Sequence, residues 1–346
     1  MTKLQAGVAA VIAVLSTATA SWAQERQITV AWYGGNWGDA FKACIAEPFT
    51  KATGIKVNGE VGTSTVTLGK LKAQKDSPSI DAAWMDGGIS EVAAAEGVVE
   101  NLDPARIKNL SNVNAEAIYK AAGINFAVGT GYYSVGIVYN TNKIKVAPTS
   151  WDDLWKPEFK ELVALPSPSN SAGVPLLLFF HQMWQHPAND LAATFSKVKA
   201  LNAGLFFDAS GAASNAFQTG EMIVGAHFNA AAWDLIDKGL PLGFVVPKEG
   251  VWATDARLHL VKGSKNRELA EKFVDQALTS DSAGCLAQKL YLGPAVKGVS
   301  VDAKVAAKLP WGEHGSVKNL KLSNWSDVNA QRAKIVDTWN REIARK

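Results

Sequence analysis

Short apolar strands that end in a turn and lead into a helix recur along this chain, and this recurrence limits the possible folds more than any other feature. In the first unit, residues 28–41, a β-branched run predicts a strand from Ile28. The glycine pair that follows favours a tight turn, and Asn36 is placed to cap a helix that begins near Trp37. A β-α-β-α order continues to about residue 97, which predicts an α/β layer with a largely parallel sheet.

Aromatic residues gather where two of these predicted strands end. In α/β sheets of this kind, ligands bind beyond the carboxyl ends of the strands. The first strand ends among Trp32, Tyr33 and Trp37. A later strand carries Trp84, ends at Asp86 and is followed by a second glycine pair. We therefore expect both strand ends to share one ligand-binding rim, although the aromatic residues could instead only close a strand-to-helix corner.

The pattern changes at residues 127–139, a long alternating stretch that is rich in glycine. We interpret it as a strand that crosses between two domains, with Tyr132 and Tyr133 near the crossover, and we interpret residues 248–255 as the return crossing. Between the crossings the same order of elements is repeated, with helices predicted at 173–184 and 210–219. A chain of 346 residues usually forms two domains.

Polar residues mark the turn before the first helix of the second half. Ser169, Asn170 and Ser171 bring hydroxyl groups and backbone N–H groups to the start of that helix. They could contact a ligand or serve only as ordinary helix caps. Asp208, at the end of a short strand, likewise could face a ligand or cap the next helix.

The N-terminus has the features of an export signal. Lys3 is followed by an apolar run that is too short to span a bilayer, and Ser21–Ala23 fits a cleavage site before Gln24. We therefore expect residues 1–23 to be removed and the mature protein to be soluble in the periplasm, although an uncleaved anchor is an alternative. The formal net charge of +3 and the lack of a Lys/Arg-rich run argue against a nucleic-acid partner.

Cysteine use fits an exported chain. Cys44 and Cys285 are the only cysteines. The oxidising compartment permits disulfides, so we favour a bond between them, and two buried free thiols are the alternative. Two cysteines without CxxC or HxxxH spacing do not make a zinc site, and we expect neither a metal site nor a cofactor.

Several stretches carry a resemblance to a known family. They are Glu47–Val57, Val138–Thr141, Pro148–Trp155 with Phe159–Lys160, Gly220–Glu221 and Leu292–Pro294. Together with the export signal, these stretches resemble the extracellular solute-binding proteins of bacterial ABC importers, in the spermidine/putrescine-binding branch. The resemblance covers most of the mature chain.

The resemblance implies a type II periplasmic-binding-protein fold. Two α/β lobes, each a mostly parallel sheet with flanking helices, would be joined by a hinge of crossing strands and would close around a solute. The protein would then deliver the solute to an inner-membrane ABC permease without catalysis, and we expect a monomer. The expected lobes are residues 24–130 with 254–298 and residues 131–253 with 299–346.

The resemblance also implies site residues. Polyamine-binding relatives hold ammonium groups with carboxylates and aromatic faces, because a desolvated cation needs an opposite charge and ring quadrupoles add about 0.5–2 kcal/mol. Where a polyamine binder would carry acids, this chain has Ser169–Ser171, so a small monoamine, quaternary ammonium or zwitterion fits at least as well. The complete predicted ligand-binding set is Trp32, Tyr33, Trp37, Trp84, Asp86, Tyr132, Ser169, Asn170, Asp208, Phe228, Trp252 and Asp255.

The residues leave three alternatives to an amine ligand. An anionic carboxylate or phosphonate is one, because Arg257 and His259 lie beside Asp255, which could itself simply pair with Arg257 on the surface. A ferric-ion carrier is another and would use the adjacent pair Tyr132–Tyr133. An exported hydrolase is a distant third, because no Gly-x-Ser-x-Gly motif precedes a helix. The residues do not separate delivery to a permease from delivery to a sensor.

Overall fold

The structure is a computed structural model that describes residues 26–187, 190–311 and 315–344. The predicted signal peptide, residues 1–23, and its cleavage site lie outside the described residues. Within the described ranges, no helix combines the length and the apolar character needed to cross a membrane.

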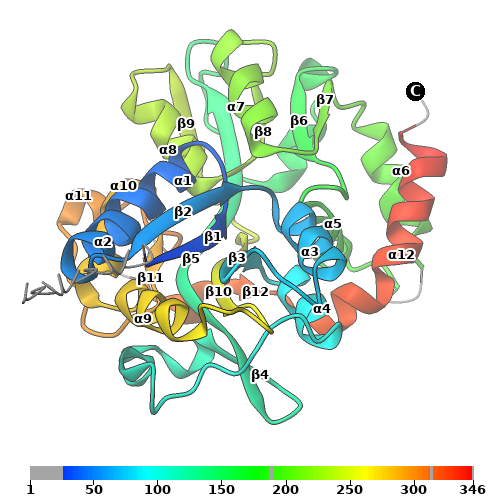
Figure 1. Cartoon of the computed structure of the whole chain (residues 1–346). Helices are drawn as coiled ribbons and strands as arrows, with labels where there is room; N and C mark the ends of the chain where they lie inside the picture. Colours follow the sequence, from blue (N-terminus) through cyan, green and yellow to red (C-terminus); the bar gives the residue numbers. More distant parts are fainter. Residues whose placement is uncertain (1–25, 188–189, 312–314, 345–346) are drawn as a thin grey trace, which may run out of the picture.

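Three parallel strands form the outer part of one half of the sheet (Figure 1). In spatial order they are β2 (Lys56–Val61), β1 (Gln27–Trp32) and β3 (Ala82–Asp86). The helical segments of this half are α1 (Asn36–Phe41), the π-helical η1 (Lys42–Ala46), α2 (Glu47–Thr53), α3 (Ser64–Ala73) and α4 (Ile89–Ala95).

Glycines set both ends of the first helical segment. The helix begins at Asn36 itself, which corrects the expectation that Asn36 caps it. Its N-cap is Gly35, whose φ of 64° favours a residue without a side chain. The segment runs through η1 and α2 and ends at Gly54, a left-handed C-cap with a φ of 71°.

The second half repeats the arrangement with a second set of parallel strands. They are β8 (Val224–Phe228), β6 (Val163–Pro166) and β7 (Leu205–Phe207), in that spatial order. The helices of this half are α5 (Gly173–Met183), α6 (Ala192–Ala200), α7 (Ser210–Thr219) and α8 (Asn229–Asp237), with the 3₁₀ turns η4 (Trp151–Trp155) and η5 (Pro157–Phe159) before β6.

Two long antiparallel strands join the halves into one sheet. β5 (Ile124–Asn140) pairs with β10 (Trp252–Leu260) through Val128–Val135 and with β8 through Val135–Tyr139. β10 in turn pairs antiparallel with β3. The sheet is therefore mixed, with parallel strands outside and antiparallel strands at the crossover. The shorter strands at its margins are β4 (Ile118–Ala121), β9 (Leu242–Val245), β11 (Gly293–Pro294) and β12 (Lys321–Leu322).

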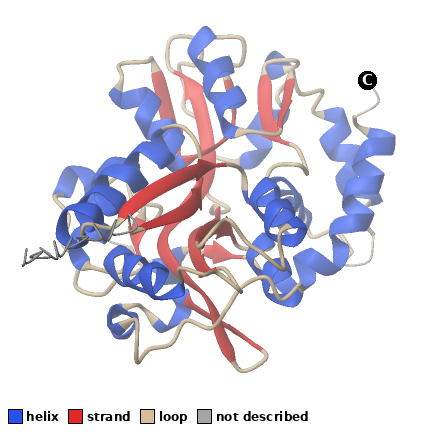
Figure 2. Cartoon of the chain, viewed as in Figure 1, coloured by secondary structure: helices blue, strands red, loops and turns tan. Residues whose placement is uncertain are grey.

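Helices flank the strands on both sides (Figure 2). The C-terminal helix α12 (Trp325–Glu342) crosses from one half to the other: it packs on α5 and α6 of the second half, while Trp325 at its start packs against the loop after β3. The remaining elements are η2 (Lys108–Asn112), η3 (Ala115–Ala117), α9 (Arg267–Ala277), α10 (Ser280–Leu290), α11 (Ala303–Ala306), η6 (Val317–Asn319) and α12 (Trp325–Glu342).

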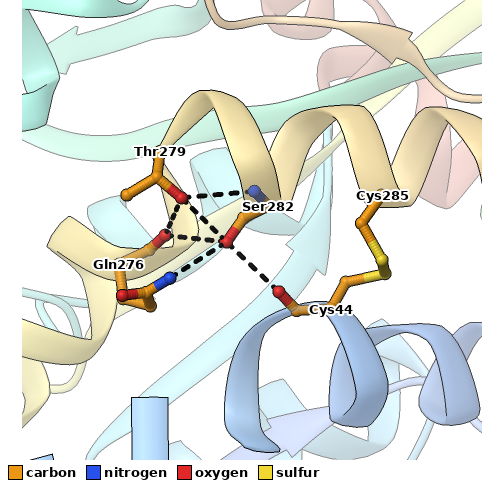
Figure 3. Close-up of a disulfide and its surroundings, with 5 residues drawn as sticks. All are labelled: Cys44, Gln276, Thr279, Ser282 and Cys285. Atoms are coloured by element: carbon orange, nitrogen blue, oxygen red, sulfur yellow. Dashed lines mark hydrogen bonds between the residues drawn. A yellow bond between two sulfur atoms is a disulfide. The ribbon is translucent and has the colours of Figure 1, made fainter. Parts of the chain in front are cut away.

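A disulfide ties the first helical segment to α10 (Figure 3). Cys44 in η1 and Cys285 in α10 are bonded, with a Cα–Cα distance of 5.6 Å. This is the favoured of the two alternatives left open by the sequence. The Ser282 hydroxyl lies 3.2 Å from the Cys44 carbonyl oxygen and adds a polar contact between the same two segments.

Candidate functional site

A cavity of about 640 Å³ lies between the two halves of the sheet. The segments that follow β1, β2 and β3 form one wall, and those that follow β6, β7 and β8 form the other. Because the strands within each set are parallel, their carboxyl ends meet at the edge where open α/β sheets bind ligands. Seven predicted site residues line this cavity: Tyr33, Trp37, Asp86, Ser169, Asn170, Asp208 and Phe228.

The Asp86 carboxylate, at the end of β3, is deeply set in the cavity wall, with 7% of the residue exposed. Its Oδ1 accepts hydrogen bonds from the hydroxyls of Tyr33 and Tyr133 at 2.7 and 2.6 Å. Its Oδ2 accepts one from Ser64 at 2.9 Å. All three donors are neutral, and within the described ranges Asp86 forms no ion pair.

Aromatic rings from both halves surround this carboxylate. Trp37 packs edge-on against Tyr33 and Tyr133, with ring centroids 5.4 and 5.3 Å apart. Phe228, from the other half, packs against Tyr133 at 5.6 Å. Burial and the Asp86 charge raise the pKa of Tyr33 and of Tyr133 well above the ordinary value. Both phenols therefore stay protonated and donate hydrogen bonds to the Asp86 carboxylate.

The opposite wall is polar and mostly neutral. Asn170 donates from Nδ2 to the Asp208 carbonyl oxygen at 3.0 Å and accepts at Oδ1 from the Ala172 N–H at 3.0 Å. Ser167 donates to the Asp208 carboxylate. Asp208 does not cap α7, because the N-cap is Ala209 and no side chain bonds to it. Asn170 therefore holds the turn, and the exposed Asp208 side chain stays beside the cavity.

Four aromatic residues of the predicted set do not line the cavity. Trp32 shares the core face of β1 with Ile28 and Val30, and its ring covers Gly59. Trp84 is fully buried, stacked on Phe41 at 4.2 Å. These two rings follow the strand parity that faces the helices, so the expectation that they reach the rim is corrected.

The other two aromatic residues are buried beside the crossover. Tyr132 lies on the opposite side of β5 from Tyr133 and packs against Trp311. Trp252 donates from Nε1 to the Ser323 hydroxyl at 2.7 Å and packs edge-on against Trp325. Both face away from the cavity because alternate residues of a strand point to opposite faces.

Asp255 is also absent from the cavity wall. It accepts hydrogen bonds from Arg257 Nε and from the Tyr119 hydroxyl, both at 2.8 Å, and it is 1% exposed. Burial alone would lower the pKa of Arg257, but the Asp255 charge raises it above the ordinary value; burial raises the pKa of Asp255, and the Arg257 charge offsets part of that rise. The alternative that Asp255 pairs with Arg257 is therefore the one observed, although in the core and not on the surface.

Sequence reasoning missed Tyr133 and Ser64 as site residues. The sequence presents Tyr133 only beside Tyr132, near the crossover, and strand alternation allows only one of two such neighbours to face the cavity. Ser64 carried no recognisable motif, because its role depends on α3 starting beside the end of β3.

The tyrosine pair does not support a ferric-ion site. Ferric carriers use phenolate oxygens, whereas Tyr133 keeps its proton and Tyr132 points elsewhere. Burial and the Asp255 charge raise the pKa of Tyr132 as well. Across the described ranges, no three or more His, Cys, Asp or Glu side chains are grouped as metal ligands would be.

Known proteins match this chain over most of its length. The family model for bacterial extracellular solute-binding proteins matches residues 45–310. The chain is 28% identical over 317 residues to the spermidine/putrescine-binding periplasmic protein 1 of Haemophilus influenzae, covering 89% of this chain and 87% of that protein. It is 24% identical over 348 residues to the gamma-aminobutyric acid-binding protein of Pseudomonas aeruginosa, covering 90% and 94%.

A solved structure agrees with the fold. The crystal structure of an ABC transporter from Clostridium perfringens is 26% identical, with a TM-score of 0.72, and the match covers 91% of this chain and 99% of that one. The two-lobed α/β fold of type II periplasmic binding proteins is thus the fold of this chain. The chain belongs to the bacterial extracellular solute-binding proteins, non-catalytic proteins that bind a small solute as part of an ABC transporter.

Proposed function

We propose that this protein binds a small amine-bearing solute whose ammonium group lies against the Asp86 carboxylate. The observation that carries the proposal is the trio of neutral hydroxyl donors, which hold the carboxylate in place without neutralising its charge. A buried charge is costly unless it is paired. An ammonium group from the solute would supply the partner through a charge-assisted hydrogen bond.

The surroundings of Asp86 favour a cation over an anion. The rings of Tyr33, Trp37 and Tyr133 present aromatic surface that attracts a cation by about 0.5–2 kcal/mol. Lys238 is the one basic residue among the described residues of the wall, and it is paired with Asp234 at 2.7 Å. The acidic residues of the wall are Asp39, Asp86, Asp208 and Asp234.

The depth of the acidic groups favours a short solute with one amine. Asp86 alone is both buried and enclosed by rings, whereas Asp208 is exposed and engaged by Ser167. A long polyamine would need a second enclosed carboxylate. The relatives named for spermidine/putrescine and for gamma-aminobutyric acid are consistent with an amine in the solute and leave its length open.

Solute capture would proceed by closure of two lobes. Residues 24–130 with 254–298 and residues 131–253 with 299–346 would rotate about the crossover strands β5 and β10, burying the solute between the walls. We propose that the mature protein acts as a monomer in the periplasm after removal of residues 1–23, and that it passes the solute to an inner-membrane ABC permease.

The proposal is tested by a thermal-shift screen over polyamines, betaines, amino acids, aminophosphonates and carboxylates, followed by calorimetry on the solutes that bind. A solute at 100 times its Kd should stabilise the protein by about 2.7 kcal/mol. Asp86→Asn should weaken binding of an amine by about tenfold to a hundredfold, because a hydrogen bond to a charged group contributes about 1.5–3 kcal/mol.

Asp255→Asn is the matched control, because Asp255 is also a buried carboxylate but lies outside the cavity. It should leave the amine affinity unchanged. Stabilisation by dicarboxylates alone, with no response to any amine, would favour the second candidate, an anionic solute. The observation behind that candidate is the hydroxyl-rich wall around Ser169 and the start of α7, where no side chain caps the helix.

A further inference from the structure

A serine on the cavity wall is bonded to a buried histidine that the proposed amine site does not use. Ser214 lies in α7, and its hydroxyl is 3.0 Å from Nε2 of His227 in β8. His227 is fully buried, whereas Ser214 borders the cavity. Such a hydroxyl can either donate its proton to the imidazole or accept one from it. The direction of this hydrogen bond decides whether the Ser214 O–H is available to donate to a solute.

The surroundings of His227 favour one of the two tautomers. The rings of Phe207, Phe217 and Phe228 pack around it, and among the described residues Nδ1 has no hydrogen-bond partner. Burial lowers its pKa to about 3, so the ring is neutral at pH 7 and carries a single N–H. A proton on Nδ1 would be a buried donor without an acceptor, which keeps the full cost of its desolvation. The proton therefore belongs on Nε2, which donates it to Ser214.

A second buried serine–histidine pair has the opposite polarity. His259 Nδ1 lies 3.0 Å from the Ala83 carbonyl oxygen, which can only accept, so the proton of His259 is on Nδ1. His259 Nε2 then accepts the proton of the Ser90 hydroxyl at 2.7 Å. In this pair the serine hydroxyl donates its hydrogen bond to the histidine. In the Ser214–His227 pair the serine hydroxyl accepts a hydrogen bond from the histidine, so its own O–H is still able to donate to another group.

We propose that His227 makes Ser214 a hydrogen-bond donor toward the cavity, and that Ser214 binds a carboxylate or phosphonate carried by the same solute whose amine meets Asp86. This inference rests on the proposed function and narrows the solute to a zwitterion. Ser214 receives one hydrogen bond and, within the described ranges, its own proton has no other acceptor. The uncapped start of α7, with Ser210 and Gly211 also on the wall, adds a favourable dipole for an anionic group.

The test uses calorimetry on the full mature chain with two matched probe pairs: 4-aminobutyrate against butylamine, and 2-aminoethylphosphonate against ethylamine. Each zwitterion should bind at least tenfold more tightly than the amine that lacks its anionic group. Ser214→Ala should remove most of that advantage without changing the affinity for the plain amine. Ser90→Ala, which breaks the other serine–histidine pair away from the cavity, should leave the advantage intact.

A spectroscopic readout tests the role of His227 independently of any ligand. Long-range ¹H–¹⁵N correlations of the imidazole should show the proton on Nε2 of His227 and on Nδ1 of His259. A His227 proton on Nδ1 would overturn the inference. His227→Phe should reduce the zwitterion advantage as Ser214→Ala does, because the freed serine hydroxyl can then turn to its own helix backbone.

The two proposals fail in different ways. If amines bind through Asp86 but Ser214→Ala leaves the zwitterion advantage unchanged, or if no advantage exists, the inference fails and the proposed function stands. If no amine or zwitterion of the screen binds, or if Asp86→Asn has no effect on those that do, the proposed function fails and the inference fails with it.

Discussion

Two buried aspartates show how partners decide the role of a residue. Asp86 receives three hydrogen bonds from neutral hydroxyls and borders the cavity, whereas Asp255 is bonded to Arg257 and Tyr119 inside the core. The first carboxylate keeps a charge that a solute can neutralise. The second carboxylate is already paired with the guanidinium group of Arg257. Their sequence contexts gave no means of telling these two situations apart.

At this scale we predict that Asp255→Asn destabilises the fold without affecting solute binding. Removing one partner of a buried ion pair leaves the other charge poorly paired, which costs about 3 kcal/mol. Glu91 also contacts Arg257 and limits the loss. Urea denaturation should show the lower free energy of unfolding, and calorimetry should show an unchanged Kd. A large loss of affinity at unchanged stability would return Asp255 to the binding site.

Two helices of the second half, α6 and α8, are not predicted by the sequence pattern, whereas α5 and α7 are predicted close to their observed bounds. The lack of a side-chain cap does not account for the difference, because α5 and α7 also begin without one. α8 follows β8 with no intervening turn residue, so no local signal marks where the strand ends and the helix begins. Most of the stability of such short helices comes from tertiary packing, which a local pattern does not report.

The C-terminal helix α12 is the element that braces the loop after Asp86. A Cβ at Gly87 would lie 2.4 Å from Nε1 of Trp325. Asn329 donates from Nδ2 to the Gly88 carbonyl oxygen at 3.0 Å. Because α12 also packs on α5 and α6, its contact with the loop after Asp86 connects that loop to the second half.

We therefore predict that Gly87→Ala weakens amine binding although residue 87 carries no binding group. The added methyl would push Trp325 or the loop aside, costing about 1–3 kcal/mol of stability and displacing Asp86 from its hydroxyl donors. Calorimetry should show at least a fivefold weaker Kd. Gly69→Ala in α3 is the control, since no atom lies within 4 Å of its added Cβ, and it should bind as the parent does. Equal affinities for the two variants would show that α12 does not position Asp86.

On the scale of the whole molecule, buried neutral histidines make stability depend on pH. Burial lowers the pKa of His259 to about 4 and that of His227 to about 3, whereas an unfolded histidine titrates near 6.5. Between those values the unfolded chain binds protons that the folded chain does not. The folded state is therefore fully stable with respect to these two histidines above pH 6.5, and the free energy of unfolding decreases as the pH falls toward 4.

We predict that the free energy of unfolding falls by about 3 kcal/mol per histidine between pH 6.5 and 4. His259→Gln should remove the part of the pH dependence that comes from His259, so the difference in the free energy of unfolding between parent and variant should shrink as the pH falls. Urea denaturation at half-unit pH steps measures this difference. A difference that stays constant across the range would mean that His259 titrates normally in the folded protein.

The sequence by itself determined the alternation of strands and helices in each half, the edge of the sheet where a cavity forms, and the family. These depend on local patterns: β-branched runs, glycine turns, and the rule that parallel strands end at a common edge. It also identified Tyr33, Trp37 and Asp86, which lie at the ends of β1 and β3 or in the helix that follows β1.

Only the tertiary structure decided which of the remaining side chains reach the cavity. Trp32, Trp84 and Trp252 are buried because the face of each strand that packs on helices is set by neighbouring elements. Cys44 and Cys285 form a disulfide although they are 241 residues apart in the sequence, and no local pattern shows that two such distant residues lie close together. Tyr133 and Ser64 converge on Asp86 from different elements. Long-range packing fixes such contacts, because the energy that places each side chain comes from residues far away along the chain.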